Sequence, residues 1–143
     1  MDGFDEIERL IPQREPIRLV DRLLEAGDKR AVTSLVVRDG LYLIDRQGRL
    51  TEPGLVEHVA QSASALLGCL ALQAGQEEPL IGYIGEIRDF HCYRCPELGD
   101  ELRTIVTLED VVGNIICARG ETRVAGELIA EGRLKLSIHS SDQ

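Results

Sequence analysis

The sequence predicts an α+β domain in which an antiparallel sheet curls around one long, buried helix. Two observations lead to this fold class. Residues 53–74 form the long stretch whose apolar residues recur every three or four positions, as they do in a helix. The segment after it, residues 79–139, divides into four β-like runs at glycines. A chain of 143 residues fits a single domain, 1–143, and can bury a core without disulfide or metal crosslinks.

The N-terminal part predicts a short helix and then a hairpin. Residues 4–10 carry three apolar side chains on one helical face, and Pro12 ends this helix. Residues 16–27 alternate apolar and polar side chains, which predicts a strand. Residues 30–40 are a second β-rich run that closes at an Asp-Gly turn signal, so we expect the two strands to pair.

The long helix is predicted to begin near Pro53, which fits a first helical turn, and to stop at Gly75. The helix is rich in small residues, namely Ala60, Ser62, Ala63, Ser64, Ala65 and Gly68. Small side chains allow another backbone to approach closely. We therefore expect a sheet to enclose this helix.

Four β-like runs follow, over residues 79–94, 100–112, 114–124 and 127–139. Each of the last three begins directly after a glycine. Short glycine turns between long strands indicate antiparallel neighbours. We therefore expect one antiparallel sheet.

The chain is acidic, with 25 acidic and 16 basic residues and a formal net charge of −9. This balance and the scarcity of aromatic residues argue against a nucleic-acid partner, which needs clustered Lys and Arg and stacking surfaces. The acidic, polar N-terminus does not resemble a signal peptide, and no apolar run reaches the roughly 18 residues of a membrane span. We expect a cytoplasmic protein without a membrane span.

In that compartment we expect the four cysteines, Cys69, Cys92, Cys95 and Cys117, to be reduced thiols. Residues 92–95 have the C-x-x-C spacing, but a structural zinc site needs a second ligand pair at matching spacing, and the sequence has none. Strand alternation through these residues places the two thiols on opposite faces. We predict no metal site.

Four sequence motifs resemble those of the FabA/FabZ-type 3-hydroxyacyl-ACP dehydratases. Residues 11–22, IPQREPIRLVDR, resemble the family's LPHRYPFLLVDR, and residues 57–61, EHVAQ, resemble its EAMAQ. Residues 93–102, YRCPELGDEL, resemble the family's Arg-Pro-x-x-Pro-Gly-Asp-x-Leu segment. Residues 124–136, VAGELIAEGRLKL, resemble its final strand pair. The motifs follow the family's order along nearly the whole chain.

The resemblance implies the hotdog fold, with a curled antiparallel sheet wrapped around one central helix. It implies homodimers or larger assemblies whose sheets join edge to edge, or a hetero-oligomer with another hotdog subunit. The implied substrate is an acyl thioester on the phosphopantetheine of acyl carrier protein, with no separate cofactor. The implied reaction is dehydration of a 3-hydroxyacyl thioester to the trans-2-enoyl product, in fatty-acid or polyene-type biosynthesis.

Glu57 matches the catalytic carboxylate of the family's Glu-x-x-Ala-Gln motif. The family's catalytic histidine belongs to a GHFP segment before the helix, and the corresponding residues 39–54 contain no histidine. The histidine of the family's opening motif is also replaced, by Gln13. If the chain catalyses the family's reaction, another residue must therefore act with Glu57 as the second proton-transferring group.

His58 is the nearest candidate by sequence. Neighbouring residues on a helix point about 100° apart, so His58 would not face Glu57 within one chain, and a histidine of a partner subunit is the alternative. His91 lies in the strand after the long helix and reaches a subunit interface only if the strand register allows, whereas His139 is expected to be solvated. Each residue also has a structural alternative. His58 would be a residue at the edge of the helix whose hydrogen bonds are satisfied, and Glu57 would only complement the helix dipole.

Three further residues are predicted to bind substrate. Gln61 and Ser64 share the helical stripe of Glu57, which also includes Gly68, and this polar-to-small stripe suits a substrate channel. Gly54 lies in the first turn of the same helix. An acidic carrier protein would also need a basic patch, because the whole chain repels it. The candidate arginines, which also fit ordinary solvated faces, are Arg14, Arg18, Arg22, Arg88, Arg94 and Arg103.

Three functions fit these observations. The first is a 3-hydroxyacyl-ACP dehydratase that uses Glu57 with His58 or a residue of a partner subunit. The second is a catalytically silent dehydratase-like subunit that binds the acyl carrier or a catalytic partner. The third is a hotdog thioesterase, in which Glu57 activates water and no histidine is required.

Overall fold

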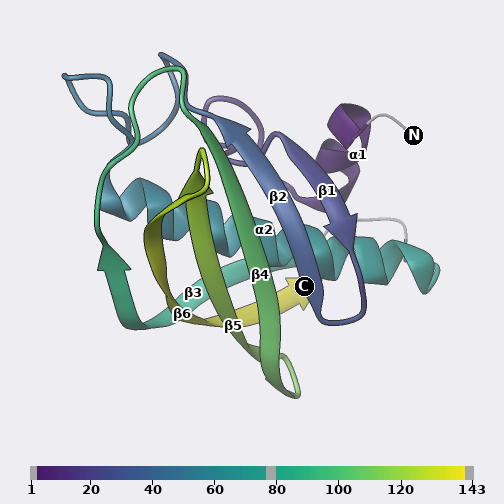
Figure 1. Ribbon diagram of the computed structural model, residues 1–143. Coiled ribbons are helices and arrows are strands. Elements are labelled where there is room, and N and C mark those ends of the chain that lie inside the picture. Colours follow the sequence, from purple (N-terminus) through teal and green to yellow (C-terminus); the bar gives the residue numbers. More distant parts are fainter. Residues whose placement is uncertain (1–2, 77–79, 141–143) are drawn as a thin grey trace.

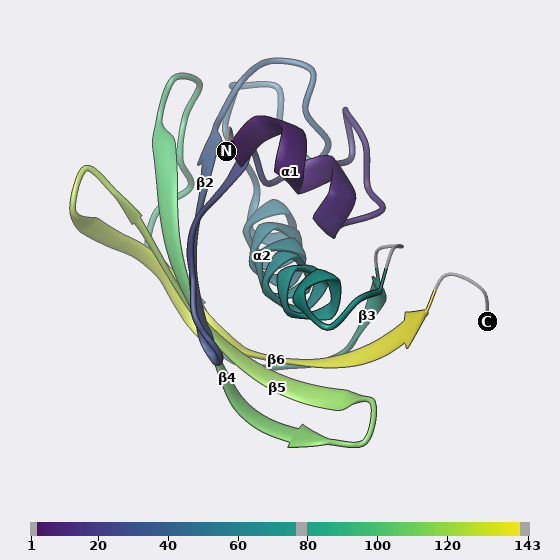
Figure 2. The same ribbon diagram turned by 90° about the vertical axis from the view of Figure 1, so that its right-hand side faces the viewer.

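The computed structural model describes residues 3–76 and 80–140, in which one sheet wraps around one helix (Figure 1). In chain order the elements are α1 (Gly3–Leu10), β1 (Arg22–Ala26), β2 (Arg30–Val36), α2 (Glu52–Gln73), β3 (Leu80–Cys92), β4 (Glu101–Val112), β5 (Ile115–Val124) and β6 (Glu127–Ser140). Figure 2, which looks along α2, shows the sheet curling around this helix while α1 covers its other side. This α+β arrangement confirms the predicted hotdog fold.

The sheet has six strands in the order β1-β2-β4-β5-β6-β3. Every neighbouring pair is antiparallel, as predicted, and β1 and β2 form the expected hairpin. Gly113 and Gly126 stand in the β4–β5 and β5–β6 turns with φ of 61° and 85°. Glycine adopts this left-handed conformation without steric cost, which explains the glycines between these strands. Strands β1 and β3 are the two edges of the sheet.

The N-terminal strand is shorter than residues 16–27, and the prediction for residues 16–21 is wrong. Side chains of α2 form hydrogen bonds with the backbone N–H and carbonyl groups that a longer first strand would use for pairing. Leu19 donates its backbone N–H to Gln61 Oε1 at 2.6 Å, and its carbonyl lies 2.6 Å from His58 Nδ1. The carbonyl of Ile17 accepts a hydrogen bond from Gln61 Nε2 at 3.0 Å. The segment before β1 is therefore fastened to the central helix.

The boundaries of α2 follow the predicted signals. Thr51 caps the helix, because its hydroxyl accepts a hydrogen bond from the Gly54 N–H at 3.3 Å. Pro53 occupies the first turn, and Gly75 follows the helix with a φ of 97°. A Cβ at Gly68 would lie 2.2 Å from the carbonyl oxygen of Leu10, so the missing side chain lets α1 pack directly on α2.

Most of α2 is buried inside the curled sheet. Its inward residues share one apolar cluster with residues from β2, β4, β5 and β6. Helix α2 is long and apolar enough by composition to cross a membrane, a test that the core helix of a soluble protein also passes. Two of its polar residues, His58 and Gln61, are also buried, and they explain much of how the site is built.

Candidate active site

A pocket of about 670 Å³ opens beside the N-terminal half of α2, and Glu57 forms part of its wall. The helix also contributes Glu52, Pro53 and Val56. The remaining wall comes from β3 and from the loop before α2, through Tyr42, Leu43, Ile84, Ile87 and Phe90. The walls are mainly apolar and carry a single half-buried carboxyl group, that of Glu57, as is common in pockets that bind small molecules.

Burial raises the pKa of the Glu57 carboxyl, and a hydrogen bond from the Gln61 side chain partly opposes that shift. The carboxyl therefore retains a proton to a higher pH than an exposed glutamate does. A raised pKa moves a carboxyl group towards the range in which general acids and bases work. Glu57 thus has the position and the environment that acid–base chemistry needs.

His58 has a different environment, although it is the next residue. Its side chain is fully buried, and its ring nitrogens contact Leu19 and Thr104. Because a carbonyl oxygen only accepts, Nδ1 must donate to Leu19, and Nε2 then accepts from the Thr104 hydroxyl at 2.7 Å. The hydroxyl oxygens of Thr104 and Thr122 lie 2.8 Å apart. A buried chain of hydrogen-bonding side chains therefore runs from His58 on α2 through Thr104 to Thr122 on β5.

Burial lowers the pKa of His58 to about 4, against the opposing effects of the Leu19 carbonyl and the Asp21 carboxylate. The ring is therefore neutral at neutral pH. Each nitrogen already has a partner, so a catalytic role for His58 would require one of these bonds to break. The structure confirms the expected geometry of the two neighbours, because Glu57 lines the pocket while His58 points into the core.

The residues predicted to bind substrate each contact a different part of the structure. Gln61 is buried and holds the segment before β1. Ser64 is buried against β3, where a Cβ at Gly82 would lie 2.8 Å from its hydroxyl oxygen. Gly54 donates its N–H to Thr51, and a Cβ there would lie 2.5 Å from Leu50. Contact of these residues with a substrate therefore stays a prediction.

The three histidines of the chain all lie in its described part, and none of them lines the pocket. His91 is exposed and stacks on Tyr93, with ring centroids 6.3 Å apart. His139 is partly buried, contrary to the solvated position that the sequence predicted. Its Nε2 lies 2.6 Å from the Ser137 hydroxyl, and its ring packs edge-on against Tyr83. Within one subunit, Glu57 lacks the histidine that the family's reaction implies.

Sequence reasoning missed the residues of β3 that complete the pocket. Ile84 and Ile87 are large, exposed apolar residues, and their exposure becomes visible only in the structure. It also missed the partners of His58. Thr104 and Thr122 occupy inward positions among the apolar residues of β4 and β5, and a polar residue at such a position requires a hydrogen-bond partner.

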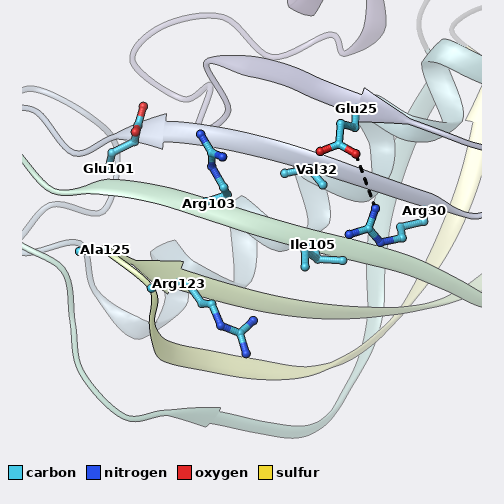
Figure 3. A pocket seen from close by; sticks show the side chains of 9 residues that line it. Glu25, Arg30, Val32, Glu101, Arg103, Ile105, Arg123 and Ala125 are labelled. Atoms are coloured by element: carbon cyan, nitrogen blue, oxygen red, sulfur yellow. Dashed lines mark ion pairs between the residues drawn. The ribbon is translucent and has the colours of Figure 1, made fainter.

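A second pocket, of about 460 Å³, lies on the outer face of the sheet. Arg30, Arg103 and Arg123 contribute to its wall from β2, β4 and β5 (Figure 3). Two of these charges have an acidic partner, because Glu25 lies 3.8 Å from Arg30 and Glu121 lies 3.7 Å from Arg123. Arg103 and Arg123 are direct cross-strand partners, an arrangement of like charges that favours an anionic neighbour.

The other predicted arginines do not join this pocket. Arg14 pairs with Glu8, and Arg18 is buried beside Val20. Arg94 pairs with Glu127 and with Asp100, and Arg88 pairs with Glu86. The six arginines therefore do not form one patch, and Arg103 alone of them lies at the outer pocket.

The two thiols of the C-x-x-C segment are neighbours, and the prediction of opposite faces is wrong. Strand β3 ends at Cys92, so strand alternation does not continue to Cys95. The two sulfur atoms lie 3.8 Å apart. Among the described residues no group of three or more His, Cys, Asp or Glu side chains is placed to hold a metal ion.

Comparison with known proteins agrees with the fold. The model of the ApeP-like family, described as ApeP dehydratase, matches residues 5–141. The chain is 31% identical to a 3-hydroxyacyl-(acyl-carrier-protein) dehydratase FabZ of Burkholderia mallei, over 98% of this chain and 94% of that protein. It is 33% identical to a FabZ of Natranaerobius thermophilus, over 96% of this chain and 98% of that protein.

A solved structure shares the fold. It is the dehydratase heterocomplex ApeI:P from Xenorhabdus doucetiae, and one of its chains superposes with a TM-score of 0.87 at 18% sequence identity, covering 95% of this chain and 92% of that one. The sequence motifs, the helix enclosed by the sheet and the full-length family match agree with one another. The chain therefore belongs to the ApeP-like dehydratase family, a FabZ-related family with the hotdog fold.

Proposed function

We propose that this chain is the ApeP-type subunit of a hotdog assembly that dehydrates 3-hydroxyacyl thioesters, and that Glu57 supplies one of the two proton-transferring groups. The observation that carries this proposal is the position of Glu57. Its carboxyl group lines an apolar pocket, and burial raises its pKa. The FabZ relatives support the substrate class, because their name specifies a 3-hydroxyacyl group on acyl carrier protein.

The reaction needs a base and an acid. The base removes a proton from C2, the electron pair forms the C2=C3 double bond, and the hydroxyl leaves C3 as water after the acid protonates it. Glu57 performs one of these transfers. None of the chain's three histidines lines the pocket, and in this proposal the second group comes from a partner subunit.

The partner pairs along β3, which is an edge of the sheet. Tyr83 and Ile87 of this strand are 58% and 51% exposed, and a long edge strand with exposed apolar side chains favours pairing with another chain. Ile87 also lines the Glu57 pocket, so a subunit docked there would reach that pocket. The heterocomplex of the neighbour from Xenorhabdus doucetiae supports a second hotdog chain as that partner.

The outer pocket is our candidate for docking the carrier protein. Three arginines and two glutamates, Glu25 and Glu101, line it, which leaves a small local excess of positive charge on a chain whose net charge is −9. Opposite charges on two partners raise the association rate and fix orientation. Arg103→Glu is expected to weaken carrier binding and to reduce its salt dependence. Arg9→Glu on exposed α1 makes the same change in net charge and is expected to have little effect. Equal weakening by both variants would contradict docking at this pocket.

His58 and Gln61 act as positioning residues in this proposal. Their side chains fasten Ile17 and Leu19 to α2. They hold the helix that carries Glu57 against the segment before β1. A proton transfer by His58 would instead require a route from its buried ring to the pocket.

The decisive assay offers 3-hydroxyacyl carrier protein to this chain alone and to its co-purified complex with a FabZ-type hotdog subunit of the same organism. We expect enoyl product from the complex, and we expect Glu57→Gln in this chain to reduce it. Enoyl formation that Glu57→Gln leaves unchanged would reject the role of Glu57. Release of free thiol in place of enoyl product would identify a thioesterase. Carrier binding without either product would identify a catalytically silent subunit.

A further inference from the structure

The C-x-x-C segment at the end of β3 contains two thiols that the proposed dehydration does not use. Cys92 is the last residue of β3, and Cys95 follows after a turn of the chain. Their sulfur atoms are 3.8 Å apart, and both residues are partly exposed. The other cysteines, Cys69 and Cys117, lie on α2 and β5. The chain therefore contains one adjacent pair of thiols at a site that solvent can reach.

The backbone holds this pair together on both sides. The N–H groups of Tyr93 and Arg94 donate to the carbonyl of Ile129 at 2.7 and 3.4 Å. After the turn, the carbonyl of Pro96 accepts from the N–H of Leu50 at 2.9 Å. The side chain of Arg94 is also tethered, since it pairs with Glu127 and Asp100. The short distance between the thiols is therefore imposed by the fold, in addition to their spacing in sequence.

Neither zinc binding nor apolar packing accounts for two adjacent thiols at this site. A structural zinc ion needs four ligands, and the described residues gather no third metal-binding side chain beside the two thiols. A purely apolar packing role fits Cys92, which contacts the cluster of Leu35, Leu50 and Leu55 and is joined there by Leu43 and Phe90. That role gives no reason for a second thiol directly against the first.

We propose that Cys92 and Cys95 form a redox-active dithiol, which a low-molecular-weight disulfide converts reversibly into an intramolecular disulfide bond. The thiolate of Cys95 attacks one sulfur of the small disulfide, forms a mixed disulfide and expels one small thiolate. The Cys92 thiol then loses its proton and attacks the Cys95 sulfur, which expels the second small thiolate. The two protein thiols lose two electrons and two protons, and the small disulfide is reduced to two thiols.

The order of attack follows from the environment of each thiol. Burial, reinforced by the neighbouring Cys95 thiol and the Glu52 carboxylate, raises the pKa of Cys92 to about 11. At neutral pH Cys92 therefore remains protonated and is a poor first nucleophile. Cys92 resolves the mixed disulfide because its sulfur lies next to that of Cys95.

The site also adjoins the Glu57 pocket. Cys92 packs against the same apolar cluster as Leu43 and Phe90, and both of these residues line that pocket. A bond between the two sulfurs draws Cys92 towards Cys95 and away from its present packing. Oxidation is therefore a modification beside the apolar cluster that also supports the pocket wall, and it involves neither Glu57 nor His58.

The test exposes the folded chain to glutathione buffers of increasing oxidised-to-reduced ratio, traps free thiols with an alkylating reagent and measures the products by mass spectrometry. We expect the wild-type chain to lose two alkylatable thiols without retaining glutathione, and a reductant to restore both. Peptide mapping is expected to place the bond between Cys92 and Cys95. Retention of all four thiols in excess oxidised glutathione, or a bond between another pair, would overturn the proposal.

Matched variants separate this pair from the other cysteines. Cys92→Ser is expected to stop at a glutathione adduct on Cys95, because the resolving thiol is missing. Cys95→Ser is expected to react more slowly than Cys92→Ser at neutral pH. The double variant Cys69→Ser/Cys117→Ser is expected to form the same bond at the same glutathione ratio as the wild type. Circular dichroism confirms that each variant is folded, and loss of the bond in this double variant would contradict the assignment.

Discussion

Glu57 and His58 are neighbours in sequence, yet they lie in two opposite kinds of environment. Glu57 faces an apolar pocket, and burial raises the pKa of its carboxyl group. His58 faces the core, where both ring nitrogens are hydrogen-bonded and burial lowers its pKa to about 4. In both residues burial favours the neutral form, but Glu57 remains accessible from the pocket. Accessibility, more than the shift in pKa, separates the candidate catalytic residue from the structural one.

This difference also shows how a buried polar residue can serve a nearby site without entering it. His58 and Gln61 use their polar atoms on the backbone of Leu19 and Ile17. The segment before β1 is thereby joined to the turn of α2 that carries Glu57. Substitution of Glu57 is therefore expected to reduce activity, whereas substitution of His58 is expected to reduce stability.

The largest effect is expected from Glu57→Gln in the dehydration assay of the complex. General acid–base catalysis contributes typically 10²–10⁴-fold, so we expect the rate of enoyl formation to fall by at least about 100-fold. The fold should be retained, since glutamine is nearly isosteric. Glu52→Gln is the matched control, because Glu52 lines the same pocket but is exposed in the first turn of α2. An equal loss in both variants would mean that the pocket needs negative charge, without a special role for Glu57.

His58→Ala is expected to lower the free energy of unfolding by roughly 3 kcal/mol, through lost packing and the loss of two buried hydrogen bonds. The Leu19 carbonyl loses its bond to the imidazole, and the Thr104 hydroxyl keeps only its contact with Thr122. Urea denaturation followed by circular dichroism measures the change. His91→Ala, on the exposed face of β3, is expected to change stability by less than about 0.5 kcal/mol. If the two substitutions cost the same, the buried chain of hydrogen bonds does not stabilise the fold.

Acid is expected to destabilise the protein through His58. Its folded pKa is about 4, below the ordinary value of 6.5, so between these values the unfolded chain binds the extra proton. Stability that is present above pH 6.5 is therefore lost as the pH falls to 4, by up to roughly 3 kcal/mol. Denaturation at several pH values measures the slope. We expect a shallower slope for His58→Gln, which cannot take up this proton, and an identical slope would rule out His58 as its source.

The smallest expected effect is that of Glu57→Gln on stability. The folded pKa of Glu57 is raised, so the folded chain keeps a proton that the unfolded chain releases first. Its favourable contribution is complete below pH 4.5 and is lost as the pH rises through the folded value. The variant is therefore expected to gain stability relative to the wild type between pH 4 and pH 7. Glu101→Gln, on the exposed outer face of β4, controls for the change in net charge and should lack this trend.

Local patterns predicted most of the elements because they depend on neighbouring residues. Helical spacing over residues 53–74 and the glycines between the later runs indicated α2 and four strands. The prediction was wrong where a distant residue competes for the backbone. Leu19 lies in an alternating run, but it is bound by Gln61, which is 42 residues away in sequence. The thiols of Cys92 and Cys95 were misplaced because strand alternation was extended to Cys95, although the predicted run ends at residue 94 and β3 ends at Cys92.

The fold class, the acidic character of the chain and the position of Glu57 on the central helix follow from the amino-acid sequence, because periodicity, composition and a short motif are local properties. The contacts of each side chain of that helix depend on how the chain folds. Glu57 meets an apolar pocket, His58 meets Leu19 and Thr104, and Ser64 meets β3. A helix orders its side chains by angle, but the pKa and reactivity of each depend on which strand or loop covers it. That covering is set by contacts between residues far apart in the chain.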